Sequence, residues 1–540
     1  MFTSSLFAAL TVMALAVPLS AITQPVTTKS GLLSGVSGRD ASIMVFKGVP
    51  YAAPPVGDLR WRVPKPPAAW RGVRNADKFS AACMQTIAHE RKPWTYEFMA
   101  HDAISEDCLY LNIWTPAKSA GDALPVFVFI HGGGFNEGSG SIAAYDGEGL
   151  AKKGLVMITI NYRLGVFGFL AHPELTKESG HHASGNYGLL DCLAALQWIR
   201  DNIVAFGGDP ARVTVAGQSA GGMAVHALVA SPLAKGLFRR AIVESGGSAA
   251  GGFNRELAEA EQSGIRFAEQ HGAGNLTALR AMTPEQLAAP APAPAGTPAA
   301  GRGEMAGILR FGAIIDGYLL PESIDQIVAQ GKQSDMPFIT GANADEGGGS
   351  PNPAIKLEVF QNQAEQRYAE QAEAFLGLYA ATNDEEAGLS NNDASRDQQR
   401  MSIYDWTQAR AKTSKSKVYT YFWVHALPGP DAARYGAFHT SEVPYALNTL
   451  RMSDRPFTDL DRKIADTVSS YWANFARTGN PNGKGLPEWP AVSERPNTTM
   501  QLGDVFEVIR TAGSPAKLAY WSTYFSRPHP PQPPVVIPGR

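Results

Sequence analysis

The segment Val213-Thr214-Val215-Ala216-Gly217-Gln218-Ser219-Ala220-Gly221 places a serine between two glycines directly after an apolar run. Residues 213–216 predict a buried strand and residues 220–230 a helix, so G-x-S-x-G stands in the strand-turn-helix setting of a nucleophile elbow. Such a turn lifts the serine hydroxyl above the sheet, and the amides at the helix start favour developing negative charge. Ser219 is therefore the candidate nucleophile.

A second glycine-rich segment, His131-Gly132-Gly133-Gly134-Phe135, follows the apolar run 126–130. Backbone N–H groups in such a loop can approach a substrate oxygen closely because glycine carries no side chain. Gly133 and Gly134, together with Ala220 after the nucleophile, are the candidate donors of an oxyanion hole. The alternative is a plain glycine loop.

Short apolar runs alternate with helical patterns from Leu124 onward, which predicts an α/β fold with a mostly parallel central sheet and helices on both faces. A helix is expected at 189–203, ended by Gly207-Gly208-Asp209-Pro210. Residues 288–303 are mainly Ala, Pro and Gly and predict a long surface insertion within one domain. The predicted strands are residues 126–130, 155–160, 213–216, 240–243, 338–340 and 417–423.

The composition of the 540 residues is that of a globular enzyme, with 44% hydrophobic and 18% charged residues. The formal net charge is −3, and no run of Lys and Arg is interleaved with aromatic residues. A nucleic-acid partner is therefore not expected.

The first 21 residues contain an apolar stretch, 6–19, followed by Ser20-Ala21, which predicts a signal peptide over 1–21. The segment before this stretch lacks Lys and Arg, so an uncleaved membrane anchor is the alternative, although the stretch is shorter than the ~20 residues of a spanning helix. No stable membrane span is expected. We therefore expect a secreted or periplasmic protein with one catalytic domain over 22–527 and a Pro-rich tail over 528–540.

Taken together, these motifs resemble the type-B carboxylesterase family, which includes cholinesterases and bacterial para-nitrobenzyl esterases. The resemblance covers nearly the whole chain after the signal peptide and implies the α/β-hydrolase fold. Besides the two motifs above, it rests on Phe46-Lys47-Gly48-Val49-Pro50-Tyr51-Ala52, Glu106-Asp107-Cys108-Leu109-Tyr110-Leu111-Asn112, Asn161-Tyr162-Arg163-Leu164-Gly165, Phe206-Gly207-Gly208-Asp209-Pro210, Tyr471-Trp472-Ala473-Asn474-Phe475 and Gly479-Asn480-Pro481.

The resemblance implies a catalytic triad of Ser219, Glu346 and His439. The acid and the base must follow the nucleophile in that order in this fold. From the residues alone, Asp345 competes with Glu346 as the acid, and His131 and His425 compete with His439 as the base. The choice among them depends on the family motif.

The resemblance also implies a disulfide between Cys108 and an upstream cysteine, which in this chain is Cys83. Spacing alone leaves three free thiols as the alternative. Cys192 lies on the predicted helix 189–203 and is expected to be a buried small hydrophobic residue. Ser245 matches a serine that supports the acid and the base in this family.

These features predict a serine carboxylesterase that hydrolyses small-molecule carboxylic esters through an acyl-enzyme and needs no metal or organic cofactor. A lipase or a specialised detoxifying esterase of the same family is the alternative, followed by a cholinesterase-like binding domain that does not catalyse. Gln218 stands where the family usually has Glu, so we hypothesise poor activity on cationic choline esters and better tolerance of neutral or anionic acyl groups.

Overall fold

A mixed sheet of eleven strands forms the centre of the computed structural model. The antiparallel strands β8 (Tyr110–Thr115), β4 (Met44–Pro50) and β3 (Val36–Ser37) extend one edge, and β16 (Glu507–Arg510) pairs antiparallel at the other. The prediction of a mostly parallel sheet is confirmed. The strands that pair in parallel are, in spatial order, β10 (Val156–Ile160), β9 (Leu124–Ile130), β11 (Gly208–Gln218), β12 (Arg240–Glu244), β13 (Phe338–Asn343), β14 (Val418–Trp423) and β15 (Thr498–Leu502).

The structure describes residues 22–87, 90–247, 255–289, 309, 311–346 and 355–527. The predicted signal peptide, the Pro-rich tail and nearly all of the predicted insertion 288–303 lie outside these residues. Among the described residues, no helix is long and apolar enough to cross a membrane.

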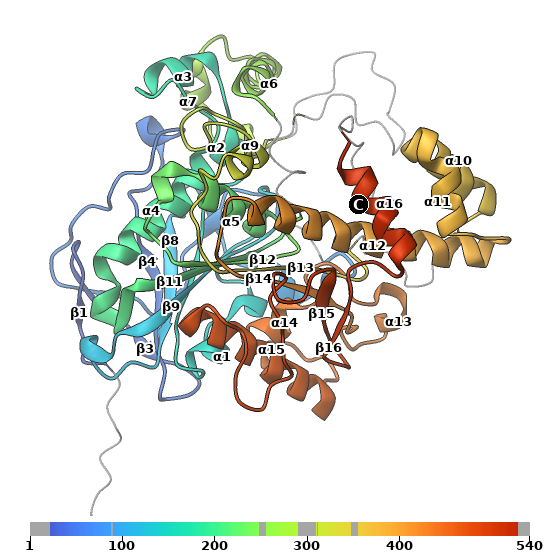
Figure 1. Cartoon of the computed structure of the whole chain (residues 1–540). Helices are drawn as coiled ribbons and strands as arrows, with labels where there is room; N and C mark the ends of the chain where they lie inside the picture. The colour runs from blue at the N-terminus through green and yellow to red at the C-terminus, as the bar shows by residue number, and fades with distance from the viewer. Residues whose placement is uncertain are drawn as a thin grey trace, which may run out of the picture.

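Side chains of the central strands alternate between two hydrophobic cores, as the period of two in a strand requires. In β9, Val126, Val128 and Ile130 join one core, and Phe127 and Phe129 join the other. The helices follow this division (Figure 1). The first core packs against α4 (Tyr187–Asn202), α5 (Ala220–Ala230), α9 (Ile324–Ala329) and part of α12 (Asp384–Ala411), and the second against α1 (Glu148–Ala151), α14 (Val443–Ala446) and α15 (Asp459–Thr478).

The predicted boundaries on either side of Gly207 differ from the structure. Helix α4 is followed by a 3-10 turn, Ile203–Phe206, before Gly207 ends the helical segment. Strand β11 begins at Gly208, five residues before the predicted start at Val213, because Gly208 pairs with Leu124 of β9 ahead of a register shift. The Gly-Gly-Asp-Pro segment therefore opens a strand as well as closing a helix.

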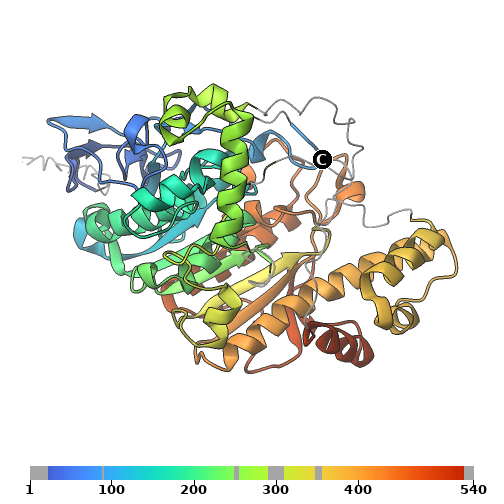
Figure 2. The same cartoon turned by 90° about the horizontal axis from the view of Figure 1, so that it is seen from above.

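A third hydrophobic core, rich in aromatic residues, holds together the helices at one end of the molecule. There α10 (Leu357–Tyr368) and α11 (Ala372–Leu378) project beside α12 (Figure 2). Trp521 of α16 (Pro515–Phe525) lies fully buried in this cluster and donates a hydrogen bond to the Tyr379 hydroxyl, 2.8 Å away. Further elements are β1 (Val26–Thr27), β2 (Leu32–Ser34), β5 (Val73–Asn75), β6 (Ala82–Cys83), β7 (Ile104–Ser105), α2 (Gly165–Phe169), α6 (Leu257–Gln270), α8 (Pro284–Ala288) and α13 (Ala432–Tyr435).

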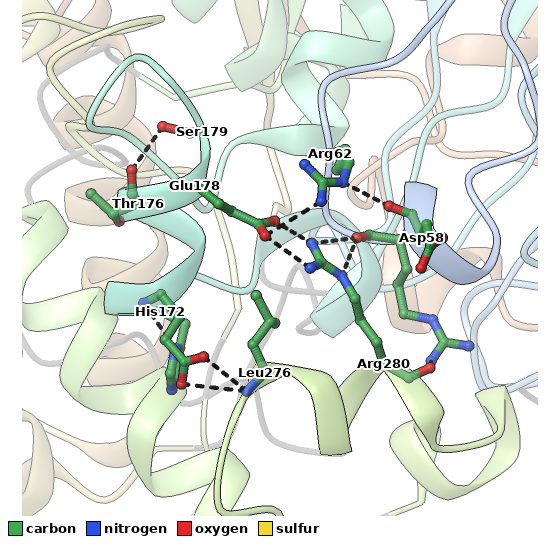
Figure 3. A network of polar contacts seen from close by, with 10 residues as sticks. Asp58, Arg62, His172, Thr176, Glu178, Ser179, Leu276 and Arg280 are labelled. Carbon is green, nitrogen blue, oxygen red and sulfur yellow. Dashed lines mark hydrogen bonds and ion pairs between the residues drawn. The ribbon is translucent and has the colours of Figure 1, made fainter.

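An ion-pair network joins α3 (Pro173–Glu178) and α7 (Leu276–Ala281) to the N-terminal turn η1 (Gly57–Leu59). The Glu178 carboxylate lies between the guanidinium groups of Arg280, 2.9 Å from Nη1, and Arg62, 3.4 Å from Nη2 (Figure 3). Arg280 is the main cause of the lowered pKa of Glu178. The network fastens these helices to the segment that joins β4 to β8.

Candidate active site

Ser219 occupies a strained turn between β11 and α5, with φ +56° and ψ −124°. Its N–H donates to the carbonyl of Glu244 on the neighbouring strand, 2.8 Å away. A Cβ atom at Gly217 would lie 2.4 Å from the Gly221 carbonyl carbon, and one at Gly221 would lie 2.0 Å from the Ile130 carbonyl oxygen. Only glycine fits at either position, so the turn geometry explains the G-x-S-x-G spacing.

His439 and Glu346 lie in contact at the carboxyl end of the sheet. Nδ1 of His439 donates to Oε2 of Glu346 in a very short hydrogen bond. The other carboxylate oxygen, Oε1, accepts from the Asn343 N–H at 2.8 Å. Ser219 and His439 line one cavity together with the glycine loop. A carboxylate that orients an imidazole beside a serine can support proton transfer from the hydroxyl.

Asp345, the alternative acid, faces away from the imidazole. Its Oδ1 accepts from Arg396 Nη2 at 2.8 Å, and its Oδ2 accepts from the Ala437 N–H at 2.8 Å. The bond to Ala437 ties the segment that carries Glu346 to the segment that carries His439. The geometry thus gives Asp345 a supporting position.

The two alternative bases are both engaged elsewhere. His131 is buried, which lowers its pKa to about 4, and its ring stacks on Tyr162 with centroids 4.5 Å apart. His425 lies between two carboxylates, with Nε2 2.9 Å from Asp461 and Nδ1 2.5 Å from Asp504. Neither histidine is among the residues that line the cavity at Ser219.

Gln218, the departure from the family pattern, is buried at the site. Its Nε2 lies 3.2 Å from Nε2 of His439 and can donate to that nitrogen when the imidazole proton is on Nδ1. A neutral amide thus occupies a place where a carboxylate would attract a positive charge.

The glycine loop has the backbone that an oxyanion hole needs. Gly133 and Gly134 adopt φ values of +102° and +61°, and both line the cavity with Ser219. A Cβ at Gly133 would lie 2.0 Å from the Glu137 carbonyl oxygen, so the loop is closely folded on itself. Ala220 is the first residue of α5, where the helix leaves its amides without intrahelical partners.

The wall opposite Ser219 comes from the chain between Cys83 and Cys108, which a disulfide closes. The cavity is small, about 70 Å³. Arg91 on this wall forms an ion pair with Glu137 of the glycine loop, and the Trp94 indole donates to the His439 carbonyl, 3.1 Å away. The apolar side chains that line the cavity are those of Ile87, Trp94, Phe98, Met99 and Ala100 on this wall, and of Ile142 and Tyr145.

Two buried carboxyl groups, those of Glu442 and Glu244, lie beside the proposed catalytic residues and match none of the motifs in the sequence. Burial, with Glu346 nearby, raises the pKa of Glu442 to about 7, and burial raises the pKa of Glu244 above its ordinary range. Glu442 accepts from the Asn343 side chain, and Glu244 accepts from the Trp472 indole at 2.6 Å. Glu442 stands three residues after His439, but an acidic residue in a loop gives no sign of burial.

Ser245, for which the family resemblance predicts a supporting role, lies close to these groups. The Ser245 hydroxyl donates to Glu442 Oε1 over 3.4 Å, so this hydroxyl is linked to the site through Glu442. Cys192, expected to be buried, is a buried free thiol on α4. Burial raises the pKa of this thiol. No group of His, Cys, Asp and Glu side chains that could hold a metal ion occurs within the described part of the chain.

Comparison with known proteins places this chain among ester hydrolases. The carboxylesterase family matches residues 23–521. Fumonisin B1 esterase of Sphingopyxis macrogoltabida is 37% identical over 87% of this chain and 84% of its own. Para-nitrobenzyl esterase of Bacillus subtilis (strain 168) is 35% identical over 89% of this chain and 94% of its own. Cocaine esterase of Homo sapiens is 33% identical over 86% of this chain and 85% of its own.

Proposed function

Since the chain belongs to the carboxylesterase family and is a carboxylic ester hydrolase of the α/β-hydrolase fold, we propose that it is a secreted serine esterase that acts through an acyl-enzyme on Ser219. The contact between His439 and Glu346, beside the cavity that Ser219 and the glycine loop share, carries this proposal. A binding domain without catalysis has no need for these groups together.

In the first half-reaction, Nε2 of His439 takes the proton of the Ser219 hydroxyl while Oγ attacks the ester carbonyl carbon. Glu346 holds the Nδ1 proton and stabilises the imidazolium that forms. The carbonyl oxygen becomes an oxyanion and accepts hydrogen bonds from the N–H groups of Gly133, Gly134 and Ala220. Collapse of this intermediate breaks the bond to the alcohol, which leaves with the proton from His439.

In the second half-reaction, water replaces the alcohol. His439 takes a proton from the water as its oxygen attacks the acyl carbon, and the bond to Ser219 Oγ then breaks as Oγ regains a proton. The products are a carboxylic acid and the free enzyme. No step requires a metal or an organic cofactor.

The proposed substrates are esters whose acyl group is small and either neutral or anionic. A cavity of about 70 Å³ favours a short acyl group, and the neutral Gln218 offers no charge to a cationic ester. The similarity to fumonisin B1 esterase favours a detoxifying esterase as the second candidate. Turnover measured across acetyl, butyryl, succinyl and choline esters, with fumonisin B1 included, separates the two.

Secretion and the domain limits belong to the same proposal. The disulfide between Cys83 and Cys108 supports an oxidising compartment, and the family match over 23–521 supports one catalytic domain over 22–527. We expect the exported protein to begin near Ile22. N-terminal sequencing of the protein from the culture medium or periplasm tests this, and a chain that retains residues 1–21 contradicts it.

A fluorophosphonate probe tests the catalytic assignment. We expect one equivalent to attach to Ser219, measured by intact and peptide mass, and to stop ester turnover. Ser219→Ala should fold with unchanged thermal stability, fail to react and show no burst of para-nitrophenol. Turnover by the folded Ser219→Ala protein, or labelling of another serine with loss of activity, contradicts the proposal.

A further inference from the structure

Gln85 joins the wall of the cavity to the glycine loop through a closed pair of hydrogen bonds. Its Nε2 donates to the Gly138 carbonyl at 2.9 Å, and its Oε1 accepts from the Gly138 N–H at 2.8 Å. The side-chain amide therefore pairs with one backbone residue as a neighbouring strand would. Gln85 is buried, so both bonds form away from bulk water.

The backbone on the other side of Gly138 leads to the proposed oxyanion donors. The neighbouring residue, Glu137, donates its N–H to the Gly133 carbonyl at 3.1 Å. The Glu137 carbonyl oxygen lies where a Cβ atom of Gly133 would need to be, at 2.0 Å. Any movement of Glu137 and Gly138 therefore moves Gly133.

The loop needs such external support because its own conformation is strained. Phe135 adopts a φ of +62°, in the left-handed region that costs a non-glycine residue free energy. Gly138 has a φ of +120°, and a Cβ there would lie 2.2 Å from Nδ1 of His131. A loop with a strained torsion at Phe135 and several conformationally free glycines keeps one shape only when its surroundings fix it.

Gln85 is itself fixed through the disulfide. Its Nε2 also donates to the Cys83 carbonyl at 3.0 Å, two residues back in the chain. Cys83 belongs to β6, which pairs with β7, and is bonded to Cys108. The supporting amide therefore rests on a covalently closed part of the chain.

We propose that Gln85 is a positioning residue for the oxyanion hole, acting through Gly138 and Glu137 to hold the amides of Gly133 and Gly134 where negative charge develops. This inference rests on the proposed serine esterase function and deepens it. Hydrogen bonds to an oxyanion matter most in the transition state, so a misplaced donor lowers kcat more than it changes KM.

The first test replaces Gln85 by Leu. We expect Gln85→Leu to lower kcat about 10- to 100-fold while KM for a para-nitrophenyl ester changes less than about threefold. The inhibition constant of a trifluoromethyl ketone, which mimics the tetrahedral intermediate, should rise by the same factor as kcat/KM falls. Binding of the product carboxylate should not change.

A matched control separates positioning from general loss of stability. Gln333 is also a buried glutamine, donates to Thr413 Oγ1 at 3.1 Å and is absent from the lining of the cavity. Gln333→Leu should lower the thermal midpoint and leave kcat unchanged. Equal losses of kcat in the two variants, at temperatures where both are folded, overturn the inference.

Gln85→Glu gives a second readout, because its bonds to Gly138 depend on the protonation of the new carboxyl group. A protonated glutamic acid can donate to the Gly138 carbonyl and accept from its N–H, as glutamine does, whereas the carboxylate repels the carbonyl. The ratio of kcat in Gln85→Glu to kcat in the wild type should therefore rise as the pH falls from 8 to 5. A constant ratio contradicts the inference.

The outcomes also distinguish this inference from the proposed function. If turnover depends on Ser219 and Gln85→Leu keeps kcat within threefold of the wild type, the inference alone is wrong. If the Ser219→Ala protein hydrolyses esters at the wild-type rate, both are wrong.

Discussion

Nδ1 of His439 meets Oε2 of Glu346 although 93 residues separate them in the chain, while the adjacent Asp345 is bound to Arg396. Two neighbouring carboxylates thus have different partners, and we expect Glu346→Gln to lower kcat about 10³- to 10⁴-fold, because the amide stabilises the wrong imidazole tautomer. Asp345→Asn is the matched control and should lower kcat less than about tenfold. Steady-state kinetics decides between them, and a larger loss in Asp345→Asn would reverse the assignment of the acid.

Gln218→Glu should change both the pH profile and the substrate preference. The new carboxylate would lie near the imidazolium of His439 and stabilise it, so the acid-side midpoint of kcat/KM should move up by about one pH unit or more. The ratio of choline-ester to neutral-ester turnover should rise as well. Gln363→Glu, at an exposed position of α10, should change neither quantity. If both quantities also stay constant in Gln218→Glu, charge at this position does not select the substrate.

Removing the disulfide should lower both stability and kcat. The Cys83→Ser/Cys108→Ser variant loses a closed loop of 25 residues, which costs about 3 kcal/mol in the free energy of unfolding. Dithiothreitol should shift the thermal midpoint of the wild type and of Cys192→Ala, but not that of the double variant. An unchanged midpoint in the wild type under dithiothreitol would contradict the Cys83–Cys108 bond.

His226 should make the protein sensitive to acid. This histidine lies between Phe338 and Trp406, and burial lowers its folded-state pKa to about 4. The unfolded chain binds a proton below about pH 6.5 and the native state does not, so stability is present above pH 6.5 and is lost as the pH falls toward 4. The loss amounts to about 3 kcal/mol.

His226→Phe should remove most of that loss. The difference in free energy of unfolding between pH 7 and pH 4, measured with urea, should shrink by about 3 kcal/mol relative to the wild type. His181→Phe at the surface is the control and should leave the difference unchanged. An unaltered difference in His226→Phe would mean that other groups cause the acid sensitivity.

Much of this fold follows from local sequence patterns. Helix α5 begins and ends at the predicted residues. The apolar run, the glycine-flanked serine and the helical pattern that follow one another in the sequence are typical of a strand, a tight turn and a helix. The predicted β12 to β14 strands lie within one to three residues of the observed ends, since buried parallel strands read as continuous apolar runs.

What the sequence leaves open depends on packing between distant segments. Asp345 and Glu346 are chemically similar neighbours, and only Arg396 and the Ala437 amide, far along the chain, separate their positions. The contact of Gln85 with Gly138 spans 53 residues and involves no charged or reactive group that would draw attention to it. Burial of Glu244 and Glu442 likewise becomes visible only once the sheet and α15 are assembled.

The walls of the cavity and its proposed reactive groups come from different parts of the molecule. Ile87, Trp94 and Phe98 lie on the chain closed by the disulfide, whereas Ser219 and Glu346 follow strands of the central sheet. Natural variation or laboratory evolution can therefore alter which esters enter the cavity while leaving the reactive groups of the enzyme unchanged. Gln85 is the exception on that stretch, so a library that diversifies the wall should keep it fixed.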